Sequence, residues 1–210
     1  MTALADRVAS DHAATVQDRV EVEAPTGELT LANWVEVVGA VLPEGTIISD
    51  EANTSGLMLP AATAGAPRHR VLTLTGGAIG QGLPVAVGAA IAAPDRPVLA
   101  LQSDGSALYT ISALWTMARE NLNVTTVLLN NSAYAILRME LQRVGAQSGG
   151  DKANSLLDLS HPDMDFVAIS TGFGVPAVRV TTAEDLATEL RRAFTEDGPH
   201  LIEAIIPPLL

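Results

Sequence analysis

Two short polar motifs in this chain carry the oxygen ligands that a magnesium ion prefers. Asp104-Gly105-Ser106 offers a carboxylate, and Asn130-Asn131 offers an amide oxygen at Asn131 that adds no second negative charge beside an anion. Gly105 permits a tight turn, and Ser106 stands where a helix N-cap is expected, so its hydroxyl and the following amides should face the anion. Neither motif contains Lys or Arg. The two motifs therefore predict a site where magnesium and a helix end neutralise a diphosphate.

The elements around these motifs predict that the motifs meet in space. Residues 98–101 and 124–129 are apolar runs typical of buried strands, and residues 106–120 between them predict a helix. That helix would carry apolar side chains at three- and four-residue steps, at Leu108, Ile111, Leu114, Trp115 and Ala118. A crossover of this kind is right-handed and joins parallel strands. Asp104 and Asn131 should therefore emerge at the same carboxyl edge of one sheet, where open α/β sheets bind ligands.

Two longer segments contain or neighbour the motifs. Residues 75–84 (TGGAIGQGLP) follow the apolar run 71–74 and open a small-residue helix at 85–93, and residues 130–138 (NNSAYAILR) continue the second motif. In this order, from about residue 29 to residue 207, the chain resembles the C-terminal, diphosphate-binding domain of thiamine-diphosphate-dependent enzymes. The nearest likeness is to the group that contains benzoylformate decarboxylase and the acetolactate synthase large subunit.

The resemblance implies the cofactors thiamine diphosphate and Mg²⁺, together with the residues that hold them. The implied magnesium ligands are the side chains of Asp104 and Asn131 and the backbone carbonyl of Ala133. The residues implied to lie against the diphosphate come from three loops: Asn53 and Thr54, Gly105 and Ser106, and the backbone around Tyr134 and Ile136. In the glycine-rich segment, Ile79 is implied to prop the cofactor in its bent form. The carbonyl of Gly77 is implied to accept a hydrogen bond from the aminopyrimidine.

The chain departs from the family pattern at three places. Ser103 stands where the family usually has glycine before the acidic residue. Leu137 occupies a position that is acidic in the pyruvate decarboxylase branch, which argues against that branch. Residues 133–142 lack the segments that usually follow the Asn pair in true acetolactate synthases. We therefore expect a decarboxylase or carboligase that acts on a small 2-keto acid.

The resemblance also implies that this chain holds only half of an active site. The family's catalytic glutamate lies on a separate pyrimidine-binding domain and acts across a subunit interface, and no segment here resembles that domain. Glu51 is better interpreted as a strand-end residue of the diphosphate loop, and Glu140 as a charge on a helix surface. We expect no catalytic residue and no turnover from this chain alone. We expect a pyrimidine-binding domain from the same or another chain, and a homodimer or tetramer.

Fold class and domain organisation follow from the resemblance and from composition. The implied fold is α/β, a three-layer α/β/α arrangement with a mostly parallel central sheet, over residues 29–210. Residues 1–28 resemble a linker or arm that follows a central domain. With 210 residues, 48% hydrophobic and 17% charged, the chain suits one domain with a sizeable core.

Charge and cysteine content exclude several other classes. The net charge of −12 disfavours nucleic acid or an anionic membrane as a partner. The sequence has no cysteine, so no disulfide, thiolate metal site or cysteine nucleophile is possible. No apolar signal core or spanning segment is recognisable, and cytoplasmic residence is the default expectation.

The remaining pattern predicts further helices and strands. Predicted helices cover residues 31–42 (with Thr30 as N-cap), 134–145, 163–171 and 183–194. Predicted strands cover residues 46–49, 71–74, 177–180 and 201–205. Thr182 and Asp185 resemble a capping box, and residues 147–155 predict a mobile loop.

Two other functions remain open from the sequence. One is a non-catalytic assembly or regulatory module, in which the helix that carries Trp115 and Met117 presents a partner surface. The other is a magnesium-dependent binder of a different diphosphate, such as a nucleotide. A nicotinamide fold is disfavoured because the glycines at 76, 77, 80 and 82 do not spell G-x-G-x-x-G. His69, just before a predicted strand, is a candidate substrate contact or a surface-loop histidine.

Overall fold

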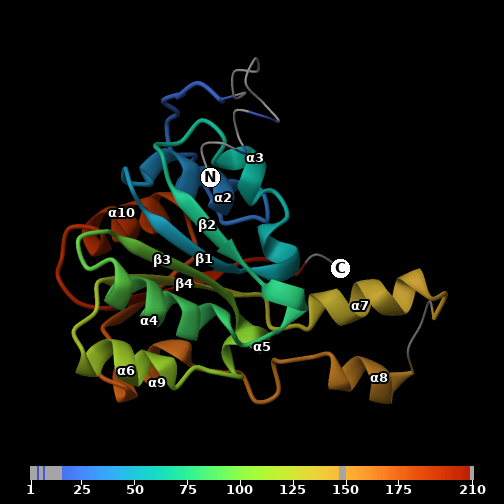
Figure 1. Ribbon diagram of the computed structural model, residues 1–210. Helices are drawn as coiled ribbons and strands as arrows, with labels where there is room; N and C mark the ends of the chain where they lie inside the picture. Colours follow the sequence, from blue (N-terminus) through green and yellow to red (C-terminus); the bar gives the residue numbers. More distant parts are fainter. Residues whose placement is uncertain (1–3, 5–6, 8–15, 147–149, 209–210) are drawn as a thin grey trace.

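One six-stranded sheet forms the centre of the computed structural model, which describes residues 4, 7, 16–146 and 150–208 (Figure 1). Its strands are β1 (Ile47–Glu51), β2 (Arg70–Thr73), β3 (Val98–Ser103), β4 (Val124–Asn130), β5 (Ala177–Val180) and β6 (His200–Ile205). They lie in the order β2-β1-β3-β4-β6-β5, and each neighbouring pair is parallel. The predicted α/β architecture is confirmed.

Helices cover both faces of the sheet and complete three layers (Figure 1). On one face lie α2 (Asn33–Val41), the short α3 (Leu59–Ala62) and α10 (Ala183–Ala193). On the other lie α4 (Gly82–Ala92), α6 (Ala113–Arg119) and α9 (Phe166–Gly172). Residues 16–28, in the predicted linker, contain no helix and no strand.

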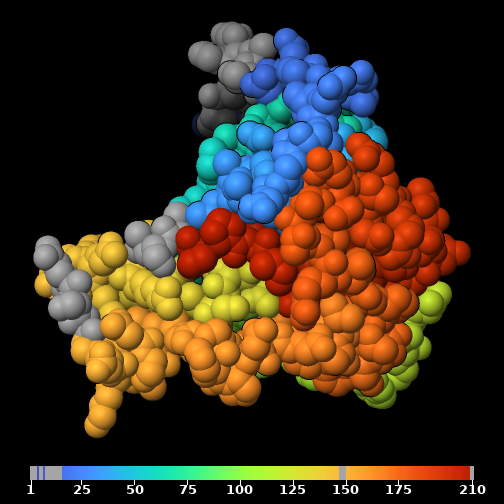
Figure 2. Space-filling model, turned by 180° about the vertical axis from the view of Figure 1, so that it is seen from behind, coloured from blue at the N-terminus to red at the C-terminus, as the bar shows by residue number. Residues whose placement is uncertain are grey.

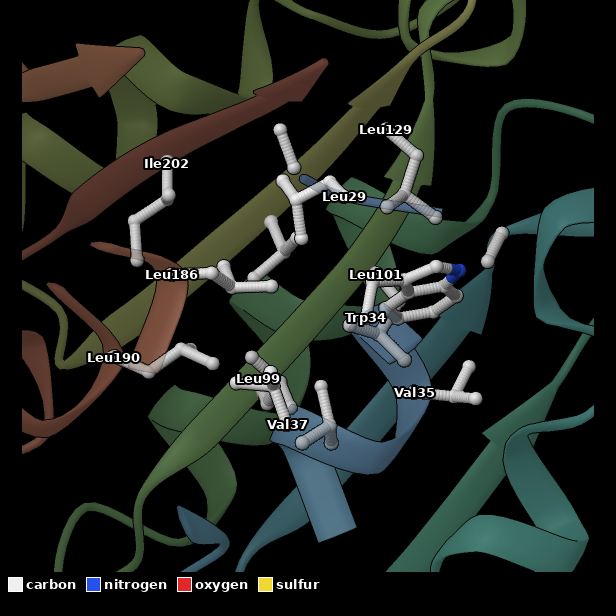
Figure 3. Packing of buried hydrophobic residues seen from close by; sticks show 14 of the residues in the cluster. Leu29, Trp34, Val35, Val37, Leu99, Leu101, Leu129, Leu186, Leu190 and Ile202 are labelled. Carbon is white, nitrogen blue, oxygen red and sulfur yellow. The ribbon is translucent and has the colours of Figure 1, made fainter. Parts of the chain in front are cut away.

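Each face of the sheet has its own apolar cluster, because successive strand residues point to opposite sides. In β3, Leu99 and Leu101 join the cluster under α2 and α10, whereas Val98 and Ala100 join the cluster under α4 and α6. Figure 3 shows the first cluster, where the fully buried indole of Trp34 lies among side chains of α2, α10 and the sheet. Burial of each such large apolar side chain contributes about 1.5–3 kcal/mol.

Local hydrogen bonds fix the starts of the helices that flank this cluster. The Asn33 amide donates to Thr30 Oγ1 at 3.1 Å, and the Thr30 amide donates to Asn33 Oδ1 at 2.7 Å. Helix α2 itself begins at Asn33, two residues later than predicted, with Ala32 and not Thr30 at its N-cap position. At α10 the Asp185 amide donates to Thr182 Oγ1 at 3.2 Å, which confirms Thr182 as the N-cap. The Asp185 carboxylate accepts the Thr182 hydroxyl at 2.7 Å.

The single helix predicted for residues 106–120 is wrong. The chain forms α5 (Asp104–Ala107), a series of turns over 108–112, and then α6. The Thr110 hydroxyl donates to the Gly80 carbonyl at 2.8 Å, and the Tyr109 side chain packs against Gly80. These tertiary contacts hold the turns away from helical geometry, and Leu108, predicted for the apolar face, is exposed.

Helix α4 is apolar on all sides, with the sequence GLPVAVGAAIA. Gly82, Leu83, Ala86 and Ala90 form its buried face, and Ile91 is exposed. None of the helices in the described ranges combines the length and apolar character needed to cross a membrane.

Helices α7 (Ala135–Arg143) and α8 (Asp151–Leu156) stand away from the sheet as a projection (Figures 1 and 2). The loop predicted for residues 147–155 is therefore partly wrong, and residues 147–149 lie outside the described ranges. Gly150 precedes α8, and its carbonyl accepts the amides of Ala153 at 2.8 Å and Asn154 at 3.1 Å. These two bonds close the first turn of a helix that the polar sequence did not suggest.

Candidate functional site

A cavity of about 340 Å³ opens at the carboxyl edge of the sheet. From β1 the chain crosses to β2 on one side, whereas β3 and β4 follow on the other, so the loops after β1 and β3 diverge at this edge. The cavity is lined by Asn53, Thr54, Ile79, Ser103, Asp104, Gly105, Ser106, Tyr109, Asn131, Ala133, Tyr134, Ala135, Ile136, Leu137 and Leu156. We call it the switch-point cavity. Of the residues predicted to bind cofactor or metal, only Gly77 is absent from this lining.

Asp104 supplies the only acidic side chain among the described residues that line the cavity, and Lys and Arg are absent from them. Asp104 is 1% exposed, and its oxygens accept the Gly105 amide at 2.8 Å and the Asn131 amide at 3.1 Å. Burial raises the pKa of Asp104, and backbone N–H groups of its own turn and of the turn after β4 partly oppose that rise. A cation at this carboxylate would offset the desolvation of its charge.

The turn after β4 (residues 131–133) presents the other two predicted metal-ligating oxygens. The Ala133 amide donates to Asn131 Oδ1 at 3.0 Å, and the Ala135 amide donates to the Ala133 carbonyl at 2.9 Å. Each of these oxygens keeps a second lone pair that could bind a metal. Within the described part of the chain, His, Cys, Asp and Glu form no group of three suited to a metal ion. The donor set therefore fits a hard cation that takes one carboxylate, neutral oxygens and ligand phosphate.

Two serines flank Asp104 and Gly105, and only Ser106 has a predicted role, as a helix N-cap that faces the anion. Ser103 precedes α5, and Ser106 is the third residue of that helix, so the predicted N-cap at Ser106 is wrong. The Ser106 hydroxyl lies 2.9 Å from Gln102 Oε1 and 3.1 Å from the Ser103 carbonyl, which it approaches as a donor. The Ser103 hydroxyl donates to the Ala52 carbonyl at 2.8 Å and ties the loop after β1 to the end of β3. The serine that replaces the family's glycine thus supports the cavity wall.

Gly105 allows a close approach across the cavity floor. A β-carbon at this position would lie 2.4 Å from Cε1 of Tyr134. Gly105 lies within α5 and has no positive φ, so the Tyr134 ring, and not the turn that the motif indicated, is what requires a glycine here.

The loops after β1 and β2 carry the remaining predicted residues. Asn53, with φ of 51°, begins the 3₁₀ turn η1 (Asn53–Gly56), and its side-chain amide donates to the Glu51 carbonyl at 3.0 Å. Ile79 is 42% exposed and lines the cavity, and its role in propping the cofactor stays a prediction. Gly77 belongs to the exposed turn η2 (Thr75–Gly77) and has φ of 69°, outside the cavity lining.

Glu51 is a structural anchor that the sequence pattern did not reveal. It ends β1, as predicted, but it is fully buried. Its carboxylate accepts the Gly80 amide at 2.5 Å, the Gly82 amide at 2.5 Å and the Gln102 side-chain amide at 2.9 Å. The anion lies at the start of α4, where the helix dipole favours negative charge. Glu51 thereby fixes the loop that presents Ile79. In the sequence, the close spacing of Gly80 and Gly82 was the sign that another group approaches this backbone.

Several other sequence candidates lie away from the cavity. His69 precedes β2 and lies at the amino edge of the sheet, so the hypothesis that it meets substrate at the cofactor edge is wrong. On the helix considered as a partner surface, Met117 is fully buried, whereas Trp115 is half-exposed beneath the Arg119 guanidinium. Glu140 is exposed and pairs with Arg143, as expected for a surface charge.

The cavity also has lining residues that were not among the predicted site residues. Tyr109, Ala135, Leu137 and Leu156 line it, and three of them are largely apolar side chains with more than two fifths of their surface exposed. Tyr109 comes from the turns between α5 and α6, and Leu156 comes from α8. Both positions depend on tertiary contacts that no local sequence pattern indicates.

Comparison with known proteins places this geometry in context. A family model described as "Thiamine pyrophosphate enzyme, C-terminal TPP binding domain" matches residues 52–204. A Mycobacterium tuberculosis protein named "Putative acetolactate synthase large subunit IlvX" is 62% identical over 211 residues, covering 100% of this chain and 41% of that protein. Benzoylformate decarboxylase of Pseudomonas aeruginosa is 39% identical over 127 residues, covering 60% of this chain and 23% of that protein.

A solved structure gives the same picture. The thiamine diphosphate-dependent 4-hydroxybenzoylformate decarboxylase of Rhodococcus jostii RHA1 superimposes with a TM-score of 0.74 at 32% identity. The match covers 93% of this chain and 35% of that chain. This chain therefore spans less than half the length of these relatives.

Proposed function

This chain belongs to the family of C-terminal TPP-binding domains of thiamine pyrophosphate enzymes, and we propose that it binds thiamine diphosphate through a magnesium ion. Asp104, Asn131 and the backbone carbonyl of Ala133 would hold the ion. The observation that carries this proposal is the pairing, at one cavity, of the buried Asp104 with the Asn131 turn, joined by the 3.1 Å hydrogen bond.

The lining of the cavity supports a diphosphate bound through metal. Without Lys or Arg in the lining, an anionic ligand needs another source of positive charge, and a divalent cation at Asp104 supplies it. Asn53 and Thr54 would contact the diphosphate from the β1 side, and Gly105, Ser106 and the backbone near Tyr134 and Ile136 would enclose it from the β3 and β4 side.

The proposed chemistry is decarboxylation or carboligation of a 2-keto acid, a class that includes the substrates named for the two decarboxylase relatives. When bound, thiamine diphosphate supplies a nucleophilic carbon for the keto group and accepts the electrons that decarboxylation releases. Ile79 would hold the cofactor bent, and the Gly77 carbonyl would accept a hydrogen bond from the aminopyrimidine. Asp104 would keep the metal, and with it the diphosphate, in place.

We further propose that the active site is completed by a pyrimidine-binding domain on the same or another chain, in a homodimer or tetramer. The length of the relatives supports this, because this chain covers 41% of the acetolactate synthase-like protein and 35% of the decarboxylase structure. The missing domain would bring the glutamate that protonates the cofactor. In the alternative of a non-catalytic module, the surface that α6 presents to a partner would include the half-exposed Trp115 but not the buried Met117.

Calorimetric titration of thiamine diphosphate into the 210-residue chain tests the cofactor site. Binding should require magnesium, and Asp104→Ala should weaken it by at least about 100-fold, which corresponds to about 3 kcal/mol for a lost charged ligand. Asp95→Ala is the matched control, since Asp95 is exposed beyond the opposite end of β3. Equal binding in chelator, or binding that survives Asp104→Ala, would contradict the proposal. Preferential binding of ADP would favour a nucleotide as the ligand.

A further inference from the structure

A third buried carboxylate, after Asp104 and Glu51, lies on β6 outside the cavity lining. Glu203 is fully buried, and burial of an unpaired charge is costly. Its Oε2 accepts Arg179 Nε at 2.8 Å from β5, and its Oε1 accepts the Asn130 side-chain amide at 2.8 Å from β4. Both partners are on strands that neighbour β6 in the sheet. Glu203 is therefore a fully paired charge that joins three strands.

The Asn130 side chain connects Glu203 to the turn that carries the proposed metal ligands. Its Nδ2 points to Glu203, which leaves Oδ1 to accept the Ser132 amide at 3.0 Å and the Ser132 hydroxyl at 3.2 Å. Ser132 has φ of 53°, a left-handed conformation that is uncommon for residues other than glycine. A conformation of this kind persists only where surrounding contacts hold it.

We propose that Glu203 is a positioning residue for the metal-binding turn, acting through Asn130. The relay runs from Arg179 to Glu203, to Asn130 and to Ser132, and it sets the directions of Asn131 and Ala133 on either side of Ser132. Glu203 and Arg179 are absent from the cavity lining, and Glu203 lies 73 residues from Asn130 in sequence. This inference rests on the proposed function for the role of Asn131 and Ala133, but the relay itself is independent of any ligand.

The relay requires a carboxylate at position 203 because both of its oxygens accept a hydrogen bond. A glutamine of nearly the same shape has one acceptor and one donor. If its oxygen kept Arg179, its NH₂ would face the Asn130 NH₂. Asn130 would then have to rotate, and its NH₂ would meet the Ser132 amide. One substitution thus reverses the hydrogen-bond polarity along the relay with almost no change in volume.

A second substitution that moves the negative charge from position 203 to position 130 should rescue the effect of Glu203→Gln. In the double variant Glu203→Gln with Asn130→Asp, the glutamine oxygen accepts Arg179 and its NH₂ donates to the new aspartate. The aspartate then accepts the Ser132 amide and hydroxyl. Net charge is restored and each contact again pairs a donor with an acceptor, although the bond between positions 203 and 130 now runs in the opposite direction. The double variant therefore separates positioning from a general loss of packing.

The experiment compares four versions of the full chain: wild type, Glu203→Gln, the double variant and Glu189→Gln. The last is a control, because Glu189 also accepts an arginine Nε at 2.8 Å but lies on α10. The first measurement is amide hydrogen exchange at Ser132 and Ala133 without ligand. The second is magnesium-dependent binding of thiamine diphosphate. Glu203→Gln should speed exchange at both amides and weaken binding by about 10- to 100-fold, as for other residues that orient metal ligands.

The double variant should recover most of both losses, and Glu189→Gln should match wild type. Unchanged exchange in Glu203→Gln, or a folded double variant with no recovery, would overturn the proposal. If wild type shows no magnesium-dependent binding, the proposed function fails, whereas the exchange rates still decide whether Glu203 positions the turn. Should Glu203→Gln not fold, Arg179→Gln removes the half-exposed end of the relay, and unchanged exchange in that variant would also overturn it.

Discussion

Three buried carboxylates surround the cofactor edge, and each has a different set of partners. Asp104 faces the cavity and accepts backbone amides, and the described residues that line the cavity include no Lys or Arg, so it retains the capacity to bind a cation. Glu51 is saturated by two backbone amides and Gln102, and Glu203 is paired with Arg179 and Asn130. The hydrogen-bond partners of a buried carboxylate, and not its residue type, thus decide whether it can bind a metal ion or serves as a structural anchor.

Replacement of Glu51 by glutamine tests its role as an anchor. One of the three donors would face an NH₂ group in place of an oxygen, and a buried unsatisfied donor costs about 1–3 kcal/mol. We expect Glu51→Gln to lower the free energy of unfolding in urea by that amount. Glu44→Gln is the control, because Glu44 is exposed and accepts a single amide at 3.2 Å. Equal stability of the two variants would show that the Glu51 contacts are dispensable.

At the scale of the element, the two glycines of α4 have different roles. A β-carbon on Gly82 would lie 2.5 Å from both Glu51 Oε2 and Gln102 Nε2, whereas one on Gly88 meets no atom within 4 Å. Gly82 allows Glu51 to approach the helix start, and Gly88 lies on the exposed side. Helix α4 can therefore begin directly over the anchor that fixes the Ile79 loop.

Alanine at each glycine separates these roles. We expect Gly82→Ala to destabilise the chain by about 1–3 kcal/mol, since it overfills a packed site. Gly88→Ala should stabilise it by about 0.5–1 kcal/mol, because alanine loses less backbone entropy in a helix. Thermal or urea unfolding of both variants measures the difference. Two changes of the same sign would show that the close contacts at Gly82 relax without cost.

At the scale of the whole molecule, the sheet order creates the site. The chain crosses to β2 on one side of β1 and then returns to the other side for β3, which opens the carboxyl edge between them. The cavity there is shallow enough that Ile79, Tyr109 and Leu156 remain substantially exposed. Such an open, partly apolar cavity suits a cofactor that a second domain covers.

The chain alone is therefore expected to bind cofactor without turning over substrate. With thiamine diphosphate, magnesium and benzoylformate, release of CO₂ should stay at the rate of the buffer blank. The benzoylformate decarboxylase of Pseudomonas aeruginosa, assayed in parallel, provides the positive control. Magnesium- and cofactor-dependent CO₂ release by this chain alone would contradict the half-site proposal and would require a proton donor within its own residues.

The sequence by itself determined that Asp104 and Asn131 emerge at one carboxyl edge, because apolar runs joined by a right-handed crossover form parallel strands of one sheet. The resemblance of the sequence to the family implied Asn53, Ile79 and Tyr134 as site residues, and all three line the cavity. The first result depends on local pattern and chain direction, and the second depends on matching motifs.

Only the tertiary structure decided which polar groups are anchors. The break between α5 and α6 depends on contacts with Gly80, and the relay from Glu203 joins strands that are distant in sequence. Glutamate in a strand gives no local sign that arginine and asparagine on neighbouring strands will pair with it. The physical reason is that burial and hydrogen-bond satisfaction are properties of the assembled sheet, which residue type and spacing along the chain do not encode.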